Sequence, residues 1–375
     1  MTLINQTDKE NPRYILQICH SYYEPFLDCA RQYAALFKDT PYRVVTVFLS
    51  GKADPHVAEK AASDEVIFLD YQSKQLTGLK LGIIKKIHAL SKQYDFAAII
   101  AHRAKPTYVA LMATKLPIFS IQHSFGNFNR FSRRLMVNSF RQRLTLLAVS
   151  NAVRDEIRAD LPGWPADKIQ TLYNRIDVDK VKAEQLDRHT ARQQLDLPQD
   201  AWIVGSVGRL HPDKDPQTLI RGFAEALPAL PENALLVMIG KGRLESELRE
   251  LITQLNLRER ILLTGAIPEA RRYFKAFDVF ALSSDHEPFG MVLLEAMAAE
   301  VPIITTDCGG GAEVVAGVGK LFPLGNSEAF AIELQRMADK FNTDTREMRQ
   351  RLQNNFSDEA VRQYFWALGT VQNLL

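Results

Sequence analysis

The stretch HEPFGMVLLEAMAAEVPIITTDCGGGAEVV, residues 286–315, decides the fold. An apolar run that ends at Ser284 precedes it, a helix is expected to begin near Gly290, and a second apolar run, PIITT, leads to the glycines at 309–311. Strand, loop, helix, strand and loop in this order are typical of a parallel α/β sheet. We therefore expect both loops at the carboxyl ends of neighbouring strands, where such sheets bind ligands.

Similar apolar runs, separated by amphipathic stretches, predict two series of buried strands. The first series lies at 14–19, 44–49, 66–69, 96–100, 117–122 and 144–150, and the second at 202–208, 234–240, 260–265, 279–284 and 302–306. We predict an α/β protein of two Rossmann-like domains with mostly parallel sheets that face a central cleft. The domains are residues 1–177, on which a C-terminal helix at about 357–375 packs, and residues 178–356.

The composition indicates a globular cytoplasmic protein. Of its 375 residues 46% are apolar, which is enough for a large core, and its cysteines, Cys19, Cys29 and Cys308, have no metal-type spacing. The polar N-terminal stretch lacks the apolar core of a signal peptide, and no run of about 18 apolar residues is present. Neither secretion nor a membrane span is expected.

Basic residues are concentrated in one region of the first domain. Residues 74–143 carry 13 basic side chains and one acidic side chain, Asp95, although the net charge of the chain is only +2. Apolar residues lie between the charges, so we expect peripheral contact with the anionic inner face of the cytoplasmic membrane or an anionic glycan or glycolipid acceptor. A solvated basic face explains the pattern equally well. Nucleic acid is not expected, because no recognition motif accompanies the charge.

Four charged side chains are candidate site residues of the second domain. Arg209 and Lys214 flank the loop after a predicted strand, where they would stabilise a diphosphate leaving group. Glu287 lies beside the expected helix start, whose backbone amides suit a phosphate or sugar oxygens. Glu295 follows more than two helical turns later, where a carboxylate can accept hydrogen bonds from a ribose diol. Any lone glutamate is more often a surface residue, so only the combination of these side chains indicates a site.

In combination these residues resemble glycosyltransferase family 4. The resemblance consists of Gly-Arg-Leu at 208–210 with Lys214, two glutamates separated by seven residues around Phe-Gly, and Gly-Gly at 309–310 followed by Glu313. These motifs cover about residues 202–322 in the family's order and spacing. Members have the GT-B fold and transfer sugars from nucleotide donors with retention of anomeric configuration.

The resemblance implies a role for each donor-site residue. Arg209 and Lys214 would hold the pyrophosphate and serve in catalysis. Glu287 would contact the donor-sugar hydroxyls, also as a catalytic residue, and Glu295 would bind the ribose. The remaining expected donor contacts are backbone groups of Phe289, Gly290, Gly309, Gly310 and Gly265, the last in a segment that lies against the base.

The first domain resembles the family less closely. His123, in IQHSFG, matches a histidine that the family places near the transferred sugar, and it is the fourth catalytic candidate. His20 and His102 are competing polar residues. In YNRID, which resembles the family's Asn-Gly-Ile-Asp, Arg175 replaces the glycine. The loop after the first strand lacks the family's paired glycines, which leaves the acceptor side undefined.

No metal or other cofactor is expected. Asp177 with Asp179 and Asp213 with Asp215 match Asp-x-Asp, but such pairs arise often by chance. Arg209 and Lys214 would already supply the positive charge that a divalent ion provides.

The expected function is metal-independent, retaining transfer of a sugar from a UDP- or GDP-sugar to a glycan or lipid-linked acceptor, in lipopolysaccharide core or surface polysaccharide assembly. Two alternatives stay open. One is a non-catalytic nucleotide-sugar binding protein, and the other is a GT-B fold epimerase or phosphorylase.

Overall fold

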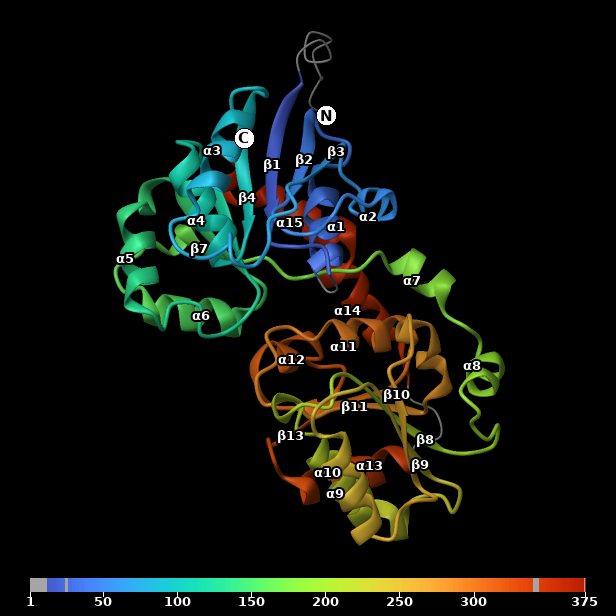
Figure 1. Ribbon diagram of the computed structural model, residues 1–375. Helices are drawn as coiled ribbons and strands as arrows, with labels where there is room; N and C mark the ends of the chain where they lie inside the picture. Colours follow the sequence, from blue (N-terminus) through green and yellow to red (C-terminus); the bar gives the residue numbers. More distant parts are fainter. Residues whose placement is uncertain (1–11, 24–25, 340–343, 374) are drawn as a thin grey trace. The chain divides into compact units, whose positions relative to one another are not determined.

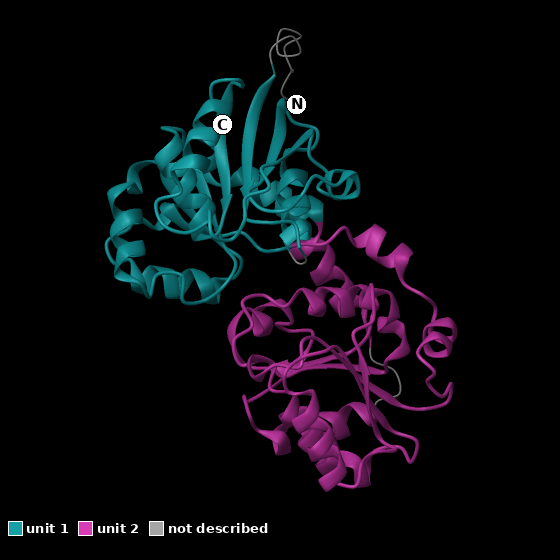
Figure 2. Ribbon diagram, viewed as in Figure 1, with its two compact units in different colours: residues 1–174, 358–375 teal, residues 175–357 magenta. Residues whose placement is uncertain are grey.

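Parallel strands joined by helices form two sheets in the computed structural model, which describes residues 12–23, 26–339, 344–373 and 375 (Figure 1). The chain divides into unit 1, residues 1–174 and 358–375, and unit 2, residues 175–357 (Figure 2). The chain thus passes from unit 1 to unit 2 after Asn174, three residues before the expected boundary, and returns after Ser357.

Unit 1 contains a sheet with the strand order β3-β2-β1-β4-β5-β6-β7, and every pairing in it is parallel. Its strands are β1 (Arg13–Cys19), β2 (Tyr42–Phe48), β3 (Glu65–Phe68), β4 (Phe96–His102), β5 (Ile118–Gln122), β6 (Leu144–Ala148) and β7 (Ile169–Thr171). Its helices are α1 (Phe26–Ala34), α2 (Pro55–Lys60), α3 (Leu81–Leu90), α4 (Ala104–Ala113), α5 (Phe131–Ser139), α6 (Asn151–Asp160), α15 (Asp358–Ala367) and α16 (Gly369–Gln372).

The closing segment of unit 1 is two helices where the sequence predicts one. Leu368 has an extended backbone, with φ −64° and ψ 124°, and separates α15 from α16. The Phe365 ring of α15 packs edge-on against Phe37 and Phe119, and the indole nitrogen of Trp366 donates a 2.8 Å hydrogen bond to the carbonyl of Leu36. These contacts attach the segment to the core of unit 1.

Unit 2 has the strand order β10-β9-β8-β11-β12-β13, again with parallel pairings. Its strands are β8 (Ile203–Val207), β9 (Leu235–Ile239), β10 (Ile261–Gly265), β11 (Val279–Leu282), β12 (Ile303–Thr306) and β13 (Lys320–Phe322). Its helices are α7 (Val178–Glu184), α8 (Arg188–Gln194), α9 (Pro216–Ala226), α10 (Glu245–Gln254), α11 (Met291–Ala298), α12 (Gly309–Val314), α13 (Ser327–Ala338) and α14 (Arg346–Phe356).

The predicted fold class is confirmed, because both units are Rossmann-like. Their central strands are almost entirely buried, as expected for apolar strands covered on both faces. In each sheet the strand order reverses between two neighbours, β1 and β4 in unit 1 and β8 and β11 in unit 2. Open α/β sheets bind ligands at the carboxyl ends of such neighbours. None of the helices that the structure describes combines the length and apolar composition needed to cross a bilayer.

Candidate functional site

An ion pair connects the carboxyl ends of β8 and β11 in unit 2. Lys214 ends a short 3₁₀ turn, Pro212–Lys214, after β8, and its Nζ lies 2.6 Å from Oε2 of Glu287 in the loop after β11. Ser284 contacts both partners, since its Oγ lies 3.2 Å from each. The side chains of Lys214 and Glu287 are only 20% and 12% exposed, so the pair is shielded from water. The strand-order reversal thus carries a fixed cation beside a fixed carboxylate.

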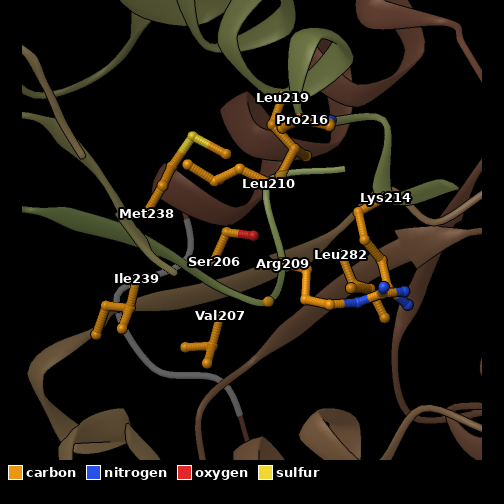
Figure 3. A pocket seen from close by; sticks show the side chains of 11 residues that line it. Ser206, Val207, Arg209, Leu210, Lys214, Pro216, Leu219, Met238, Ile239 and Leu282 are labelled. Atoms are coloured by element: carbon orange, nitrogen blue, oxygen red, sulfur yellow. The ribbon is translucent and has the colours of Figure 1, made fainter. Parts of the chain in front are cut away.

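Arg209 adds a second cation, and it lines the same pocket as Lys214 (Figure 3). Its side chain is 68% exposed and lies 3.0 Å from Asp213. Burial raises the pKa of Asp213, but the hydrogen bond with His211 and the nearby Arg209 and Lys214 outweigh it and lower that pKa below its usual value. Asp213 therefore stays ionised and positions Arg209, while Lys214 is positioned by Glu287.

The two glycine-bearing loops of the deciding stretch pack directly on each other. The Gly310 amide donates a 2.8 Å hydrogen bond to the carbonyl of Glu287, and a Cβ at Gly310 would lie 2.2 Å from the carbonyl oxygen of Pro288. Gly290 caps α11 with φ +91°, which a side chain rarely adopts. Gly310 was among the residues expected to contact the donor through their backbone, but its amide is hydrogen-bonded within the protein. The glycines allow the close approach that supports Glu287.

The other predicted donor residues of this stretch lie on or beside α11. Glu295 is half-buried in the second turn of the helix, and its carbonyl accepts a 3.3 Å hydrogen bond from Gln185. The Phe289 side chain is 2% exposed and packs against Phe356, so it belongs to the core, and only its backbone is available for the expected contact. The roles of these residues in binding a donor stay predictions.

Sequence reasoning missed Lys241, which follows β9. Gly265 ends β10, and a Cβ built on it would lie 3.4 Å from Cε of the exposed Lys241, which places this lysine beside the segment expected against the base. The run IGKGR at 239–243, a strand end with two basic residues between glycines, was the available signal. Ser284 was also missed, because a lone serine at a strand end has no distinctive pattern.

His123 belongs to unit 1. Of the two competing candidates, His102 and His20, it contacts His102. Its Nε2 lies 3.0 Å from Nδ1 of His102, and the rings are stacked. His20 lines the same small pocket as both. The pKa values of His102 and His123 are lowered by burial, that of His102 to about 3, so both rings are neutral at physiological pH. Contact of His123 with a transferred sugar stays a prediction.

The aspartates of the two Asp-x-Asp matches have separate contacts. Asp177 caps α7 by accepting from the amide of Lys180. Asp215 accepts a 2.6 Å hydrogen bond from the hydroxyl of Thr218, whereas Asp213 pairs with Arg209. In the described ranges, no group of three or more acidic, histidine or cysteine side chains is arranged to hold a metal ion.

Comparison with known proteins identifies the family. Residues 30–180 match the family model described as Glycosyltransferase Family 4, and residues 187–357 match that described as Glycosyl transferases group 1. The chain belongs to glycosyltransferase family 4. Fully buried Arg175, in place of the glycine of the family motif, is therefore a variation within the family.

Curated glycosyltransferases match this chain over part of its length. An N-acetylgalactosamine-N,N'-diacetylbacillosaminyl-diphospho-undecaprenol 4-alpha-N-acetylgalactosaminyltransferase of Campylobacter jejuni is 29% identical over 57% of this chain and 58% of its own. The lipopolysaccharide core biosynthesis glycosyltransferase LpsE of Rhizobium meliloti is 31% identical over 53% and 56%. The chain thus spans about half the length of the curated relatives it matches.

The likeness to solved structures extends over the whole fold. The structure of Anabaena HepE in complex with UDP superposes with a TM-score of 0.79 at 20% identity, and the match covers 97% of this chain and 100% of HepE. At this identity the likeness supports the GT-B fold alone.

Proposed function

We propose that the protein transfers a sugar from a nucleoside diphosphate sugar, UDP- or GDP-linked, to an acceptor hydroxyl with retention of configuration. The observation that carries the proposal is the Lys214–Glu287 pair beside Arg209, at the strand-order reversal of unit 2 in a family 4 chain. The arrangement combines what such a donor requires, namely cations for its diphosphate and a carboxylate for its sugar hydroxyls.

The hydrogen-bonding capacity of the pair fits this role. An ammonium group has three N–H donors, and those of Lys214 already reach Glu287 and Ser284, which leaves one for a phosphate oxygen. Oε2 of Glu287 accepts from Lys214 and Ser284, and Oε1 is then the oxygen that would accept from a sugar hydroxyl. Arg209 would add a planar fork for the leaving diphosphate.

The proposed chemistry needs neither a metal nor a protein nucleophile. Arg209 and Lys214 supply the positive charge that offsets the developing charge of the diphosphate. The acceptor hydroxyl attacks on the face from which the leaving group departs, and a donor phosphate oxygen accepts its proton. Glu287 thereby keeps its bond to Lys214 throughout instead of forming a covalent glycosyl intermediate.

We further propose an anionic glycan or lipid-linked acceptor, as in lipopolysaccharide core or surface polysaccharide assembly, at the cytoplasmic face of a membrane. The names of the Campylobacter and Rhizobium relatives support this acceptor class. Unit 1 exposes large apolar side chains among the basic residues of 74–143, and this composition suits an anionic bilayer surface. The most exposed of them are Leu79, Leu81, Phe131 and Leu135, at 69%, 61%, 71% and 56%.

The direct test measures nucleotide binding and then transfer. The melting temperature is measured with UDP, GDP, ADP and CMP for the native protein, Glu295→Ala and a control, Glu247→Ala, on the exposed face of α10. We expect one nucleoside diphosphate to raise it, with the increase lost only in Glu295→Ala. The matching nucleotide sugar should then release nucleotide only with a glycan acceptor. Release without an acceptor or a requirement for inorganic phosphate would contradict transfer.

A further inference from the structure

A second polar cluster lies at the strand-order reversal of unit 1, which the proposed donor site does not use. His20 follows β1, His102 ends β4, and Arg103 follows it as the N-cap of α4. Together with neighbouring side chains they line one small pocket, whose full lining is Cys19, His20, Phe26, Cys29, His102, Arg103 and His123. This is the position at which an open α/β sheet binds a ligand.

Three buried nitrogens of the pocket's lining residues, His20 Nδ1, His102 Nε2 and Arg103 Nε, have no hydrogen-bond partner among the described residues. His102 is 5% exposed, and its Nδ1 faces Nε2 of His123 at 3.0 Å. Its other ring nitrogen, Nε2, is buried without any hydrogen-bond partner among the described residues. Burying a polar atom without a hydrogen-bond partner costs its hydration free energy with no compensation. The unpartnered Nε2 therefore indicates a ligand that completes the hydrogen bond.

The same pocket carries positive charge that no described carboxylate neutralises. The Arg103 guanidinium lies over the Phe26 ring, with Cζ 4.5 Å from the centroid, and its Nε is buried without a hydrogen-bond partner among the described residues. Lys105 follows in the first turn of α4, and both cations lower the pKa of His20, after the larger effect of burial. The N-terminus of α4, a helix of ten residues, adds its free amides and partial positive charge.

We propose that the carboxyl ends of β1 and β4 and the N-terminus of α4 form a subsite for a phosphate or diphosphate group of the acceptor. Arg103 and Lys105 neutralise the anion, the α4 amides donate to its oxygens, and His102 Nε2–H completes the set. The assignment to the acceptor rests on the proposed function, whereas the anion site itself does not. A glycan phosphorylated or diphosphate-linked at this point is the matching substrate class.

Occupation of the subsite has a consequence for His123. Donation from His102 Nε2 requires the proton on that nitrogen, which leaves Nδ1 of this neutral ring as an acceptor. His123 must then donate from Nε2, so its Nδ1 becomes the acceptor that faces Sγ of Cys29 at 3.9 Å. Binding of an anion thereby fixes the tautomers of both rings.

The test is titration of the full-length protein with inorganic pyrophosphate. Pyrophosphate should also bind at the donor site, so we use Arg209→Gln as the reference and add Arg103→Gln, Lys105→Gln or the control Lys115→Gln, an exposed lysine beyond the other end of α4. We expect Arg103→Gln and Lys105→Gln each to weaken binding about tenfold, and Lys115→Gln to change it less than twofold. If the variants at the two ends of α4 weaken pyrophosphate binding equally, the proposed site is wrong. Lys105 is exposed, so its variant keeps the test valid if Arg103→Gln fails to fold.

Two further readouts identify the ligand's source. Nitrogen-15 spectra of the histidines should place the protons of His102 and His123 on Nε2 when pyrophosphate binds, and unchanged tautomer populations would contradict the subsite. Vesicles of phosphatidylglycerol should not compete with pyrophosphate for binding. If they compete, and Arg103→Gln abolishes the competition, the ligand of this subsite is a lipid headgroup and not the acceptor. If the protein binds a nucleotide but Arg103→Gln does not weaken pyrophosphate binding, the subsite alone is refuted. If Arg103→Gln weakens pyrophosphate binding but no nucleotide binds, the proposed donor site alone is refuted.

Discussion

Replacement of Lys214 by methionine tests whether the ion pair at the strand-order reversal serves both stability and catalysis. Opposite charges 2.6 Å apart attract by about 6 kcal/mol at an effective dielectric constant of about 20. Desolvation of the two groups offsets much of this attraction, and removing one partner of a fully buried pair costs about 3–5 kcal/mol. Because Lys214 and Glu287 keep 20% and 12% exposure, we expect Lys214→Met to lower the free energy of unfolding of unit 2 by about 2–3 kcal/mol.

The double variant separates the two roles of Lys214. Glu287→Gln removes the carboxylate that Lys214→Met leaves unpaired, so the combination should recover about half of the lost stability. Transfer activity should fall about 100-fold or more in Lys214→Met, with no recovery in the double variant, because the cation for the leaving group stays absent.

The assay is hydrogen exchange of the β8 and β11 amides across a urea series, together with nucleotide release under acceptor saturation. The two units need not unfold together, and exchange of the β8 and β11 amides reports the unfolding of unit 2 alone. Two results would refute the reasoning. Additive stability changes would show that the pair is not coupled, and restored activity in the double variant would show that Lys214 only supports the fold.

Other features of the structure give three further predictions. Gly310→Ala places a Cβ 2.2 Å from the Pro288 carbonyl, so nucleotide affinity measured by calorimetry should fall at least tenfold, and wild-type affinity would show that the loops separate freely. Between about pH 6.5 and pH 3, His102 is protonated in the unfolded chain but stays neutral in the folded one. The free energy of unfolding of unit 1, measured from urea midpoints, should therefore fall by up to about 1.4 kcal/mol for each unit that the pH is lowered, and by less in His102→Gln. Phe131→Ser should weaken sedimentation with phosphatidylglycerol vesicles about tenfold, and the control Leu324→Ser, in unit 2, should not.

The strands that the sequence predicts share one property, and the strands that it misses lack it. All eleven predicted runs are strands, and nine of them are buried along most of their length, as expected for parallel strands covered on both faces. The other two, β3 and β10, are half-buried edge strands whose sequences are nevertheless mostly apolar. β7 and β13 were not predicted. Both are three-residue strands at sheet edges, IQT and KLF, where little apolar surface is buried and pairing with the neighbouring strand decides the conformation.

The sequence predicts which charged side chains lie together better than it predicts the placement of backbone groups. Arg209, Lys214 and Glu287 lie together because the carboxyl ends of adjacent parallel strands must, and that topology follows from the order of the elements. The internal hydrogen bond of Gly310 and the vacant Nε2 of His102 depend on loop packing and ring orientation. No spacing rule encodes either of them. The break at Leu368 was hidden for a similar reason, since leucine is compatible with a continuous helix.

The return of the chain to unit 1 after Ser357 has a consequence for biosynthesis. Phe37 and Leu36 emerge early from the ribosome, but their partners Phe365 and Trp366 emerge only after all of unit 2. Unit 2 is continuous and can fold as soon as it has been translated, whereas the first half of the chain must wait with an uncovered apolar surface. The domain made first is therefore completed last, and this interval is when a nascent chain most needs a chaperone.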